Sequence, residues 1–248
     1  MDMSEFAKAR IAIIAALERE VRPLVKRWRV AEKEYCGRQF RFFETDDVVV
    51  VCGGIGAEAA RRAAEAAIVL YSPNVIYSVG FAGALNSELK IGDLVEPRRV
   101  VNASDGSSTD IDRGKGVLVT STAVASPAQK SRLRESFGAQ AVDMEAAAVA
   151  RAAEARGIGF AALKAISDDC DFTFPETDRF VDSGGRFREA RFALFAAVRP
   201  WLWPRVAKLA RDSSRASRAL CRSLQNLLDS QMSISDDSGH ALEAVPPR

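Results

Sequence analysis

The sequence predicts an α/β fold in which helices cover a central sheet and the ligand site lies at the ends of the strands. Short apolar runs of strand length alternate with segments of helical spacing along most of the chain, a pattern typical of a largely parallel sheet. A length of 248 residues suits one α/β domain or at most two small ones. Hydrophobic residues at 48% and charged residues at 27% are ordinary globular values.

The first elements follow from this pattern. The run Ile11 to Ala16 is continuously apolar and predicts a buried strand, and the acids after Leu17 suit the first turn of a helix that reaches Val25. The next expected elements are a hairpin strand over 40–43, a buried strand over 48–52, an Ala-rich helix over 57–71, and a buried strand over 75–79 that ends in Gly80-Phe81-Ala82-Gly83.

The second half continues the alternation. Ser126 and Pro127 predict the start of a short helix, because serine caps a helix and proline fits its first position. The other expected elements are a strand that begins within 91–95, a polar loop over 102–116, strands over 117–120 and 140–144, a helix over 145–156, and a strand over 160–166 that ends at Ser167-Asp168-Asp169.

The chain is expected to divide into three parts. Residues 1–185 form the α/β domain, residues 186–228 have helical patterns interrupted by Pro200 and Pro204, and residues 229–248 are polar and predict a disordered tail.

Basic residues are concentrated near the C-terminus. Seven Lys or Arg face one Asp over 199–222, beside Trp201 and Trp203. Two interpretations stay open: helices that cover the sheet and leave a basic face in solvent, or an amphipathic helix that makes a peripheral contact with an anionic membrane.

Several function classes are excluded by composition. The single histidine, His240, lies in the polar tail, so neither a Ser-His-Asp triad nor a histidine metal site is expected. Four separated cysteines, without a Cys-x-x-Cys pair, predict neither a zinc site nor a disulfide framework. A net charge of +2 argues against a nucleic-acid partner. Without an apolar leader or a membrane-spanning run, the expected location is the cytoplasm.

A glycine turn offers a cofactor hypothesis. Gly54-x-Gly56-x-x-Ala59 follows a strand and precedes a helix, as in dinucleotide-binding proteins. That fingerprint needs an acid at the end of the next strand for the ribose hydroxyl, and the segment from Asn74 to Val79 has none. We therefore interpret the glycines as a tight turn and expect no cofactor.

Three acids stand at separate junctions of strands and helices: Glu20, Glu145 and Asp168. The ends of parallel strands meet at one edge of a sheet, so the three carboxyls could share one site. Each could equally be a solvated acid at a helix end.

At these residues the chain resembles the nucleoside phosphorylase and nucleosidase superfamily, in particular the methylthioadenosine/S-adenosylhomocysteine nucleosidases. The resemblance covers about residues 10–171, and its motifs are Ile13-Ile-Ala-Ala-Leu-Glu-Arg-Glu-Val21, Ser78-Val-Gly-Phe-Ala-Gly-Ala-Leu85 with Leu89-Lys-Ile-Gly-Asp-Leu-Val95, Val142-Asp-Met-Glu-Ala146, and Ala165-Ile-Ser-Asp168. It implies a three-layer sandwich around a central twisted mixed sheet, and hydrolysis of an N-glycosidic bond to a purine.

The resemblance also implies residue roles. Asp168 would be the general acid that delivers a proton toward N7 of the purine, with Ser167 orienting its carboxyl group. Glu145 would bind the ribose hydroxyls and face the developing cation, with Met144 packed under the sugar. Glu20 would hold and deprotonate the attacking water.

The nucleophile follows from the same comparison. Phe81 replaces a small hydroxyl residue in the loop Gly80-Phe81-Ala82-Gly83, which lines the substrate and would otherwise offer an oxyanion ligand. Water is therefore favoured, although Arg61 or Arg62 could reach a phosphate, and phosphate would be a co-substrate only in phosphorolysis.

Two departures bear on the substrate. Val124 and Ala125 stand where the family has an aromatic residue that stacks on adenine, and 95–116 is shorter than in the methylthioadenosine enzymes. The segment 125–130 looks more like the hopanoid-associated nucleoside phosphorylases of hopanoid biosynthesis, which release adenine from adenosylhopane. Phe172 is expected to line the apolar side of the substrate or an oligomer contact.

The hypotheses are therefore a purine nucleosidase, a phosphorylase or nucleosidase acting on a lipid-linked nucleoside at the inner face of the membrane, and a nucleoside-binding module without catalysis. The resemblance further implies a homodimer or a larger homo-oligomer. Intact Glu20 and Asp168 speak against the binding module.

Overall fold

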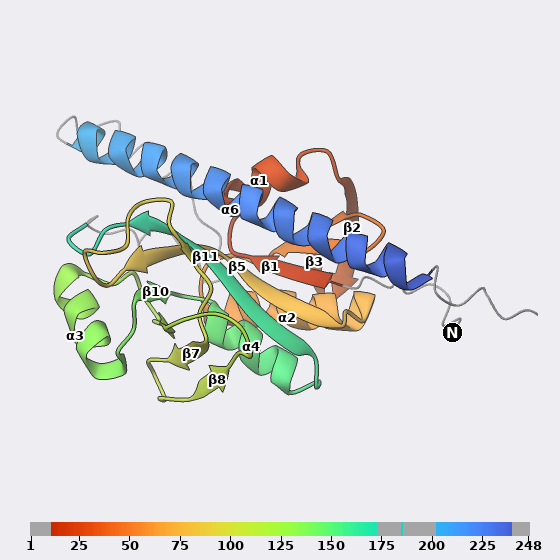
Figure 1. Ribbon diagram of the computed structural model, residues 1–248, viewed down its shortest axis with the longest axis horizontal. Coiled ribbons are helices and arrows are strands. Elements are labelled where there is room, and N and C mark those ends of the chain that lie inside the picture. The colour runs from red at the N-terminus through yellow and green to blue at the C-terminus, as the bar shows by residue number, and fades with distance from the viewer. Residues whose placement is uncertain (1–10, 173–184, 186–201, 240–248) are drawn as a thin grey trace, which may run out of the picture.

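The computed structural model describes residues 11–172, 185 and 202–239, with side chains described up to Ser230. Eleven strands form one sheet, and helices cover both of its faces (Figure 1). The elements in chain order are β1 (Ile11–Ala15), α1 (Glu18–Val25), β2 (Arg29–Tyr35), β3 (Arg38–Glu44), β4 (Val48–Cys52), α2 (Ala57–Tyr71), β5 (Val75–Ala84), β6 (Leu94–Val95), β7 (Arg99–Asn102), β8 (Ser108–Asp110), β9 (Val117–Thr120), α3 (Pro127–Phe137), β10 (Ala141–Asp143), α4 (Ala146–Glu154), β11 (Gly159–Asp168) and α6 (Trp203–Gly239).

The sheet is mixed. Its main path runs β2-β3-β4-β1-β5-β10-β9-β7-β8, and β11 pairs with both β5 and β6. Strands β4, β1, β5 and β11 are parallel neighbours, whereas β2, β3 and β4 pair in antiparallel fashion. The expected three-layer sandwich with a central mixed sheet is confirmed.

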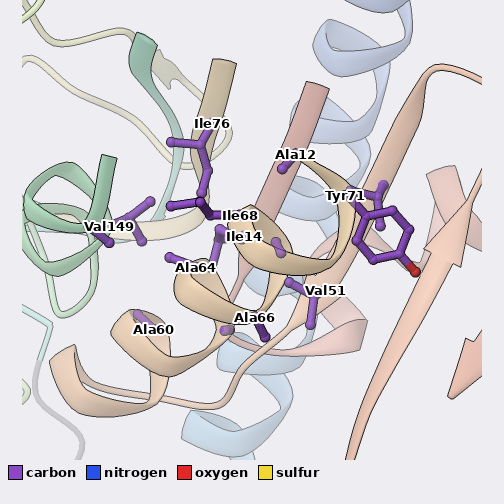
Figure 2. Packing of buried hydrophobic residues seen from close by; sticks show 14 of the residues in the cluster. Ala12, Ile14, Val51, Ala60, Ala64, Ala66, Ile68, Tyr71, Ile76 and Val149 are labelled. Carbon is purple, nitrogen blue, oxygen red and sulfur yellow. The ribbon is translucent and has the colours of Figure 1, made fainter. Parts of the chain in front are cut away.

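Alternate residues of β1 belong to different layers. Ala12 and Ile14 pack in the hydrophobic core beneath α2 and α4, whereas Ile13 packs in the core that α1 and α6 cover. Because successive side chains of a strand point to opposite faces, a strand buried on both faces must be apolar throughout. Figure 2 shows the first of these cores, with Ala64 and Ile68 of α2 facing Ile76 of β5.

Helix α6 covers the other face of the sheet. Leu220, Leu224 and Leu228, spaced four residues apart, are buried against α1 and the sheet. Ser217 Oγ donates a hydrogen bond to the backbone oxygen of Glu20 over 3.0 Å, so α6 also fixes the first turn of α1. Among the described residues, no helix has the length and apolar character needed to cross a membrane.

The C-terminal part differs from the expectation. Helix α6 continues to Gly239, although a disordered tail was expected from 229, and no glycine or proline interrupts the chain between Pro204 and Gly239. Pro204 lies in the first turn, where a proline removes no helical hydrogen bond. Pro200, Trp201 and the rest of 186–201 lie outside the described residues, as do 240–248.

Two strands are longer than the sequence pattern indicates. Strand β5 was expected over 75–79 but continues to Ala84, and β11, expected over 160–166, continues to Asp168. The two strands pair in parallel along their lengths, so hydrogen bonds to β11 hold the glycine segment of β5 in extended form. Strand β2 was not expected, and β8 lies within 102–116, where a polar loop was expected. The exposed, polar sequences of both strands carry little apolar signal.

Candidate active site

Glu20 is the third residue of α1, and its carboxylate folds back over the start of that helix. Its Oε2 accepts hydrogen bonds from the backbone N–H groups of Ala16 (3.1 Å) and Leu17 (3.2 Å). A Cβ atom on Gly80 would lie 2.9 Å from Oε2, so glycine lets the carboxylate rest against β5. Burial raises the pKa of Glu20, while the Leu17 N–H and the Lys164 ammonium act in the opposite direction.

Glu145 precedes α4 and is half-buried. Its Oε1 accepts the backbone N–H of Gly56 at 2.8 Å, and its Oε2 accepts that of Met144 at 3.3 Å. Burial raises the pKa of Glu145 to about 7, and the negative charges of Asp143 and Glu20 act in the same direction. The glycine turn thus supplies a backbone hydrogen-bond donor to Glu145.

Lys164 is the cation around which these acids gather. Its ammonium lies 2.9 Å from Asp143 Oδ2 and donates to Ser78 Oγ at 3.0 Å, and both charged side chains are 1% exposed or less. Asp143 also accepts hydrogen bonds from Thr120 Oγ1 and from the N–H of Ala146. Burial alone would lower the pKa of Lys164, but the neighbouring acids outweigh it and the pKa is raised. The lysine therefore stays charged and offsets the buried carboxylates.

Asp168 ends β11 and is partly open to solvent, with 22% of its side chain exposed. Ser167 Oγ donates to its Oδ1 at 2.8 Å and also lies 3.4 Å from the backbone oxygen of Ala82. The Lys130 ammonium donates to Oδ2. Both oxygens of this carboxyl group are therefore held by side-chain donors.

The pairing of β5 and β11 shows how far Asp168 lies from Lys164 and the acids near it. Gly80 pairs with Lys164, and Gly83 pairs with Asp168. At the rise of a strand, about 3.3 Å per residue, Asp168 lies on the order of 10 Å beyond the cluster of Glu20, Glu145 and Lys164. The structure thus brings two of the predicted acids together around one lysine and places the third further along the same pair of strands.

The other expected site residues have mixed environments. Ala82 is buried in the core, and Ala125 is buried under α3. Met144 and Phe81 are half-buried, and Phe81 packs toward the core that α6 covers. Val124 is 49% exposed, so it offers an apolar surface rather than a buried wall.

Phe172 and the two candidate phosphate ligands have other partners. The Lys208 ammonium of α6 lies 5.2 Å from the centroid of the half-buried Phe172 ring. Arg61 and Arg62 form ion pairs with Glu58 on the surface of α2. With residues of β2 and β3 they line a separate hollow of about 330 Å³ that contains none of the three acids.

Sequence reasoning missed Lys130, Asp143 and Lys164. Lys164 had a signal, because it is a single charge within the apolar run over 160–166. Asp143 lies within the motif Val142-Asp-Met-Glu-Ala146, two residues before Glu145, and no role was predicted for it. Lys130 had a weak signal, because it lies three residues before Leu133 and seven before Phe137, on the helix face that packs against the core.

The fold and this site define a class of protein: an α/β sandwich with buried carboxylates at strand ends, where the described residues form no cluster suited to a metal ion. The family model described as "Phosphorylase superfamily" matches residues 10–128 and 110–198. The chain belongs to this superfamily, as its motifs indicated.

The chain is similar to named relatives and to solved structures. The chain is 26% identical over 197 residues to the 5′-methylthioadenosine/S-adenosylhomocysteine nucleosidase of Bacillus pumilus, with 64% of this chain and 85% of the relative covered. It is 25% identical over 225 residues to the aminodeoxyfutalosine nucleosidase of Campylobacter jejuni, with 75% and 96% covered. The futalosine hydrolase structure of Helicobacter pylori superposes with a TM-score of 0.68 at 19% identity, with 92% of this chain and all of that chain covered (100%), and supports the fold.

Proposed function

We propose that this protein is a purine nucleosidase that hydrolyses the N-glycosidic bond of a 5′-modified adenine nucleoside, such as methylthioadenosine or S-adenosylhomocysteine. The observation that carries the proposal is that the Glu20 carboxylate rests against Gly80, the β5 partner of Lys164, and that Asp168 ends the same strand as Lys164. The charge of Lys164 also acts on Glu145. The names of the relatives support the reaction class, since both are nucleosidases.

Breaking this bond places positive charge on the ribose and negative charge on the base. Glu145 is suited to the sugar, because the Gly56 N–H fixes its half-buried carboxylate, and a fixed charge that is partly shielded from water stabilises a cation well. A pKa near 7 means that Glu145 exchanges protons in the neutral range, and an adjacent sugar cation favours its ionised form.

Glu20 is suited to the water. Burial raises its pKa, so it is a stronger base than an exposed glutamate, and two backbone N–H groups fix its orientation. It would take one proton from water as the water oxygen bonds to the anomeric carbon of the ribose. Lys164 would remain charged beside it and limit the accumulation of negative charge.

Asp168 is suited to the base. It is accessible, and the Ser167 hydroxyl orients it. It would pass a proton to N7 of the purine as the bond to the ribose breaks and the bonding electrons move to the base.

The test is release of free adenine from methylthioadenosine by the purified chain and by Asp168→Asn. The wild type is expected to release adenine. The variant should lose about 100-fold or more in kcat, the scale of a general acid, while its thermal unfolding stays close to that of the wild type. A folded Asp168→Asn variant with wild-type turnover contradicts the mechanism. Tight nucleoside binding without turnover in the wild type would instead identify a binding module.

Water is the proposed nucleophile, and phosphate is the alternative. The ion pairs of Arg61 and Arg62 with Glu58, in a separate hollow, support water. Turnover should therefore be independent of added phosphate and yield free ribose derivative. Ribose 1-phosphate as product would establish phosphorolysis.

One observation favours a second candidate, a lipid-linked adenine nucleoside such as adenosylhopane. Four exposed arginines, at spacings of four, three and four residues, form a basic stripe on the outer face of α6: Arg211, Arg215, Arg218 and Arg222. Trp203 at the start of α6 is 55% exposed, and Lys208, about a turn further along, bonds to Asp169 beside the proposed acid.

We propose that this stripe can contact an anionic membrane. Co-sedimentation with phosphatidylglycerol vesicles, but not phosphatidylcholine vesicles, is expected, and a stripe variant with all four arginines replaced by glutamine should stay in solution. Equal sedimentation of both proteins would contradict it.

A further inference from the structure

The most deeply buried side chain of helix α3 is a lysine, accompanied by the partly buried Leu133 and Phe137. It begins at Pro127 after the Ser126 cap, and Lys130 is the buried residue among its eleven positions. The Lys130 side chain is only 3% exposed. Burial of an ammonium is costly unless it is paired, so its contacts indicate what it is there to hold.

Those contacts all lie at the end of β11. The Lys130 ammonium donates to Asp168 Oδ2, and it donates to the backbone oxygen of Asp169 at 2.6 Å. Gly83 leaves the space for this arrangement, because a Cβ atom there would lie 2.7 Å from Asp168 Oδ2 and 3.1 Å from the ammonium nitrogen. The pair therefore depends on three separate elements, α3, β5 and β11.

The arrangement is that of an ionised carboxylate. Ser167 donates to one oxygen of Asp168 and Lys130 donates to the other, whereas a protonated carboxyl group would itself donate from one oxygen. An ionised Asp168 has no proton of its own to give, and the ammonium that donates to it is that of Lys130.

Among the described residues, the acids that neighbour Lys130 and Asp168 are paired with other cations. Asp169 on the same strand end is bonded to Lys208 of α6 at 3.2 Å. Asp143 on β10, a strand against which α3 packs, is paired with Lys164. Each of these acids thus has its own cation.

We propose that Lys130 is a positioning residue that supplies the proton for Asp168, an inference that rests on the proposed role of Asp168. As the bond from ribose to purine breaks, its electron pair moves to the base. Lys130 passes one N–H proton to Asp168 Oδ2, and Asp168 passes a proton to N7. Water bonds to the anomeric carbon and gives its proton to Glu20. Lys130 ends as a neutral amine, Glu20 ends protonated, and exchange with solvent restores both.

The proposal predicts a distinctive pH dependence. A lysine ammonium keeps its proton through the neutral range, whereas a carboxylic acid has given its proton up by then. With Lys130 present, the proton stays available at neutral and mildly alkaline pH. In Lys130→Met, Asp168 must carry the proton itself, so activity should survive only toward acid pH.

The experiment measures kcat between pH 5 and pH 9, a range chosen as roughly that between the ordinary pKa values of carboxyl and ammonium groups. Lys130→Met is expected to lose about 10-fold to 100-fold at pH 8 and to recover part of this at pH 5. Lys130→Arg keeps the ion pair but cannot release a proton, so its kcat should fall across the whole range. Lys208→Met, which removes a cation from Asp169 and leaves Asp168 paired, is the matched control and should keep the wild-type profile.

The outcomes separate the two proposals. A wild-type profile in Lys130→Met, a loss that is equal at every pH, or full activity in Lys130→Arg overturns the role of Lys130. If Lys130→Met does not fold, Lys130→Arg decides alone, since it preserves the charge. Turnover by Asp168→Asn overturns the proposed function itself, whereas its inactivity together with an unchanged Lys130→Met profile overturns only this inference.

Discussion

Replacing Lys164 by methionine tests the electrostatics of the buried cluster. The substitution keeps most of the side-chain volume and removes the charge that faces Asp143, Glu145 and Glu20. The Lys164 and Asp143 side chains are 1% and 0% exposed, so the loss leaves an uncompensated buried charge. Breaking one partner of such a pair costs about 3–5 kcal/mol, a large part of the roughly 5–15 kcal/mol that stabilises a domain.

The assay is urea unfolding at pH 7.5, followed by circular dichroism, with Lys208→Met as the control. Lys208 also pairs with two acids but is 43% exposed, and exposed pairs contribute only about 0–1 kcal/mol. We expect a free energy of unfolding about 3–5 kcal/mol lower in Lys164→Met and almost unchanged in Lys208→Met. A similar loss in both variants would refute the reasoning.

The sign of the pH dependence gives a second check on the same variant. Without Lys164, the folded-state pKa values of Glu20 and Glu145, which burial already raises, move further up, so the folded protein binds more protons than the unfolded chain. Stability is then present at low pH and is lost as the pH rises through the raised values. The difference in free energy of unfolding between Lys164→Met and the wild type should therefore shrink as the pH is lowered from about 7.5 toward about 5, the range in which carboxyl groups of raised pKa take up protons. A constant deficit would contradict it.

Three further predictions use other features of the structure. The pKa of Glu145 rises from 4.5 to about 7 on folding, so the wild type loses up to about 3 kcal/mol of stability as the pH rises between these values. Glu145→Gln should remove this loss, measured by urea unfolding at each pH. The same pH dependence of stability in both proteins would oppose the raised pKa of Glu145. Gly80→Ala places a Cβ 2.9 Å from Glu20 Oε2 at a φ of +148°, so it should lower kcat and also lower the free energy of unfolding by about 1–3 kcal/mol. Gly37→Ala, where φ is +73° in open space, should lower stability alone. Equal kcat values in the two variants would count against contact with Glu20. Leu224→Ala should cost about 2–5 kcal/mol in thermal unfolding, because this fully buried residue fixes α6 to the sheet, and a change under about 1 kcal/mol would mean that α6 adds little.

The predictable parts of the fold are those in which apolar residues recur at the spacing of a strand or a helix. Strand β1 is apolar on both faces because helices cover both, so its sequence alone marks a central strand. Helix α2 was expected over 57–71 and occupies Ala57–Tyr71. Here the glycine turn, the run of small helix-forming residues and the end of the apolar spacing all agree.

The parts that were missed depend on pairing between distant segments. The glycines of 80–83 predicted the end of a strand, but β11 supplies the hydrogen bonds that extend β5 to Ala84. Lys130 is 38 residues from Asp168 in sequence. Its spacing to Leu133 and Phe137 indicates the inward face of the helix, but not which strand end that face meets. Such a contact follows from the register of the sheet, which local patterns do not determine.

The central claim is that carboxylates in this site direct water to the anomeric carbon of a purine nucleoside. It is tested most directly by incubating the protein with methylthioadenosine in ¹⁸O-labelled water that contains phosphate, and analysing both products by mass spectrometry. The account predicts free adenine together with a methylthioribose that carries one ¹⁸O atom. Unlabelled sugar phosphate, or no cleavage of any adenine nucleoside by the folded protein, would contradict it.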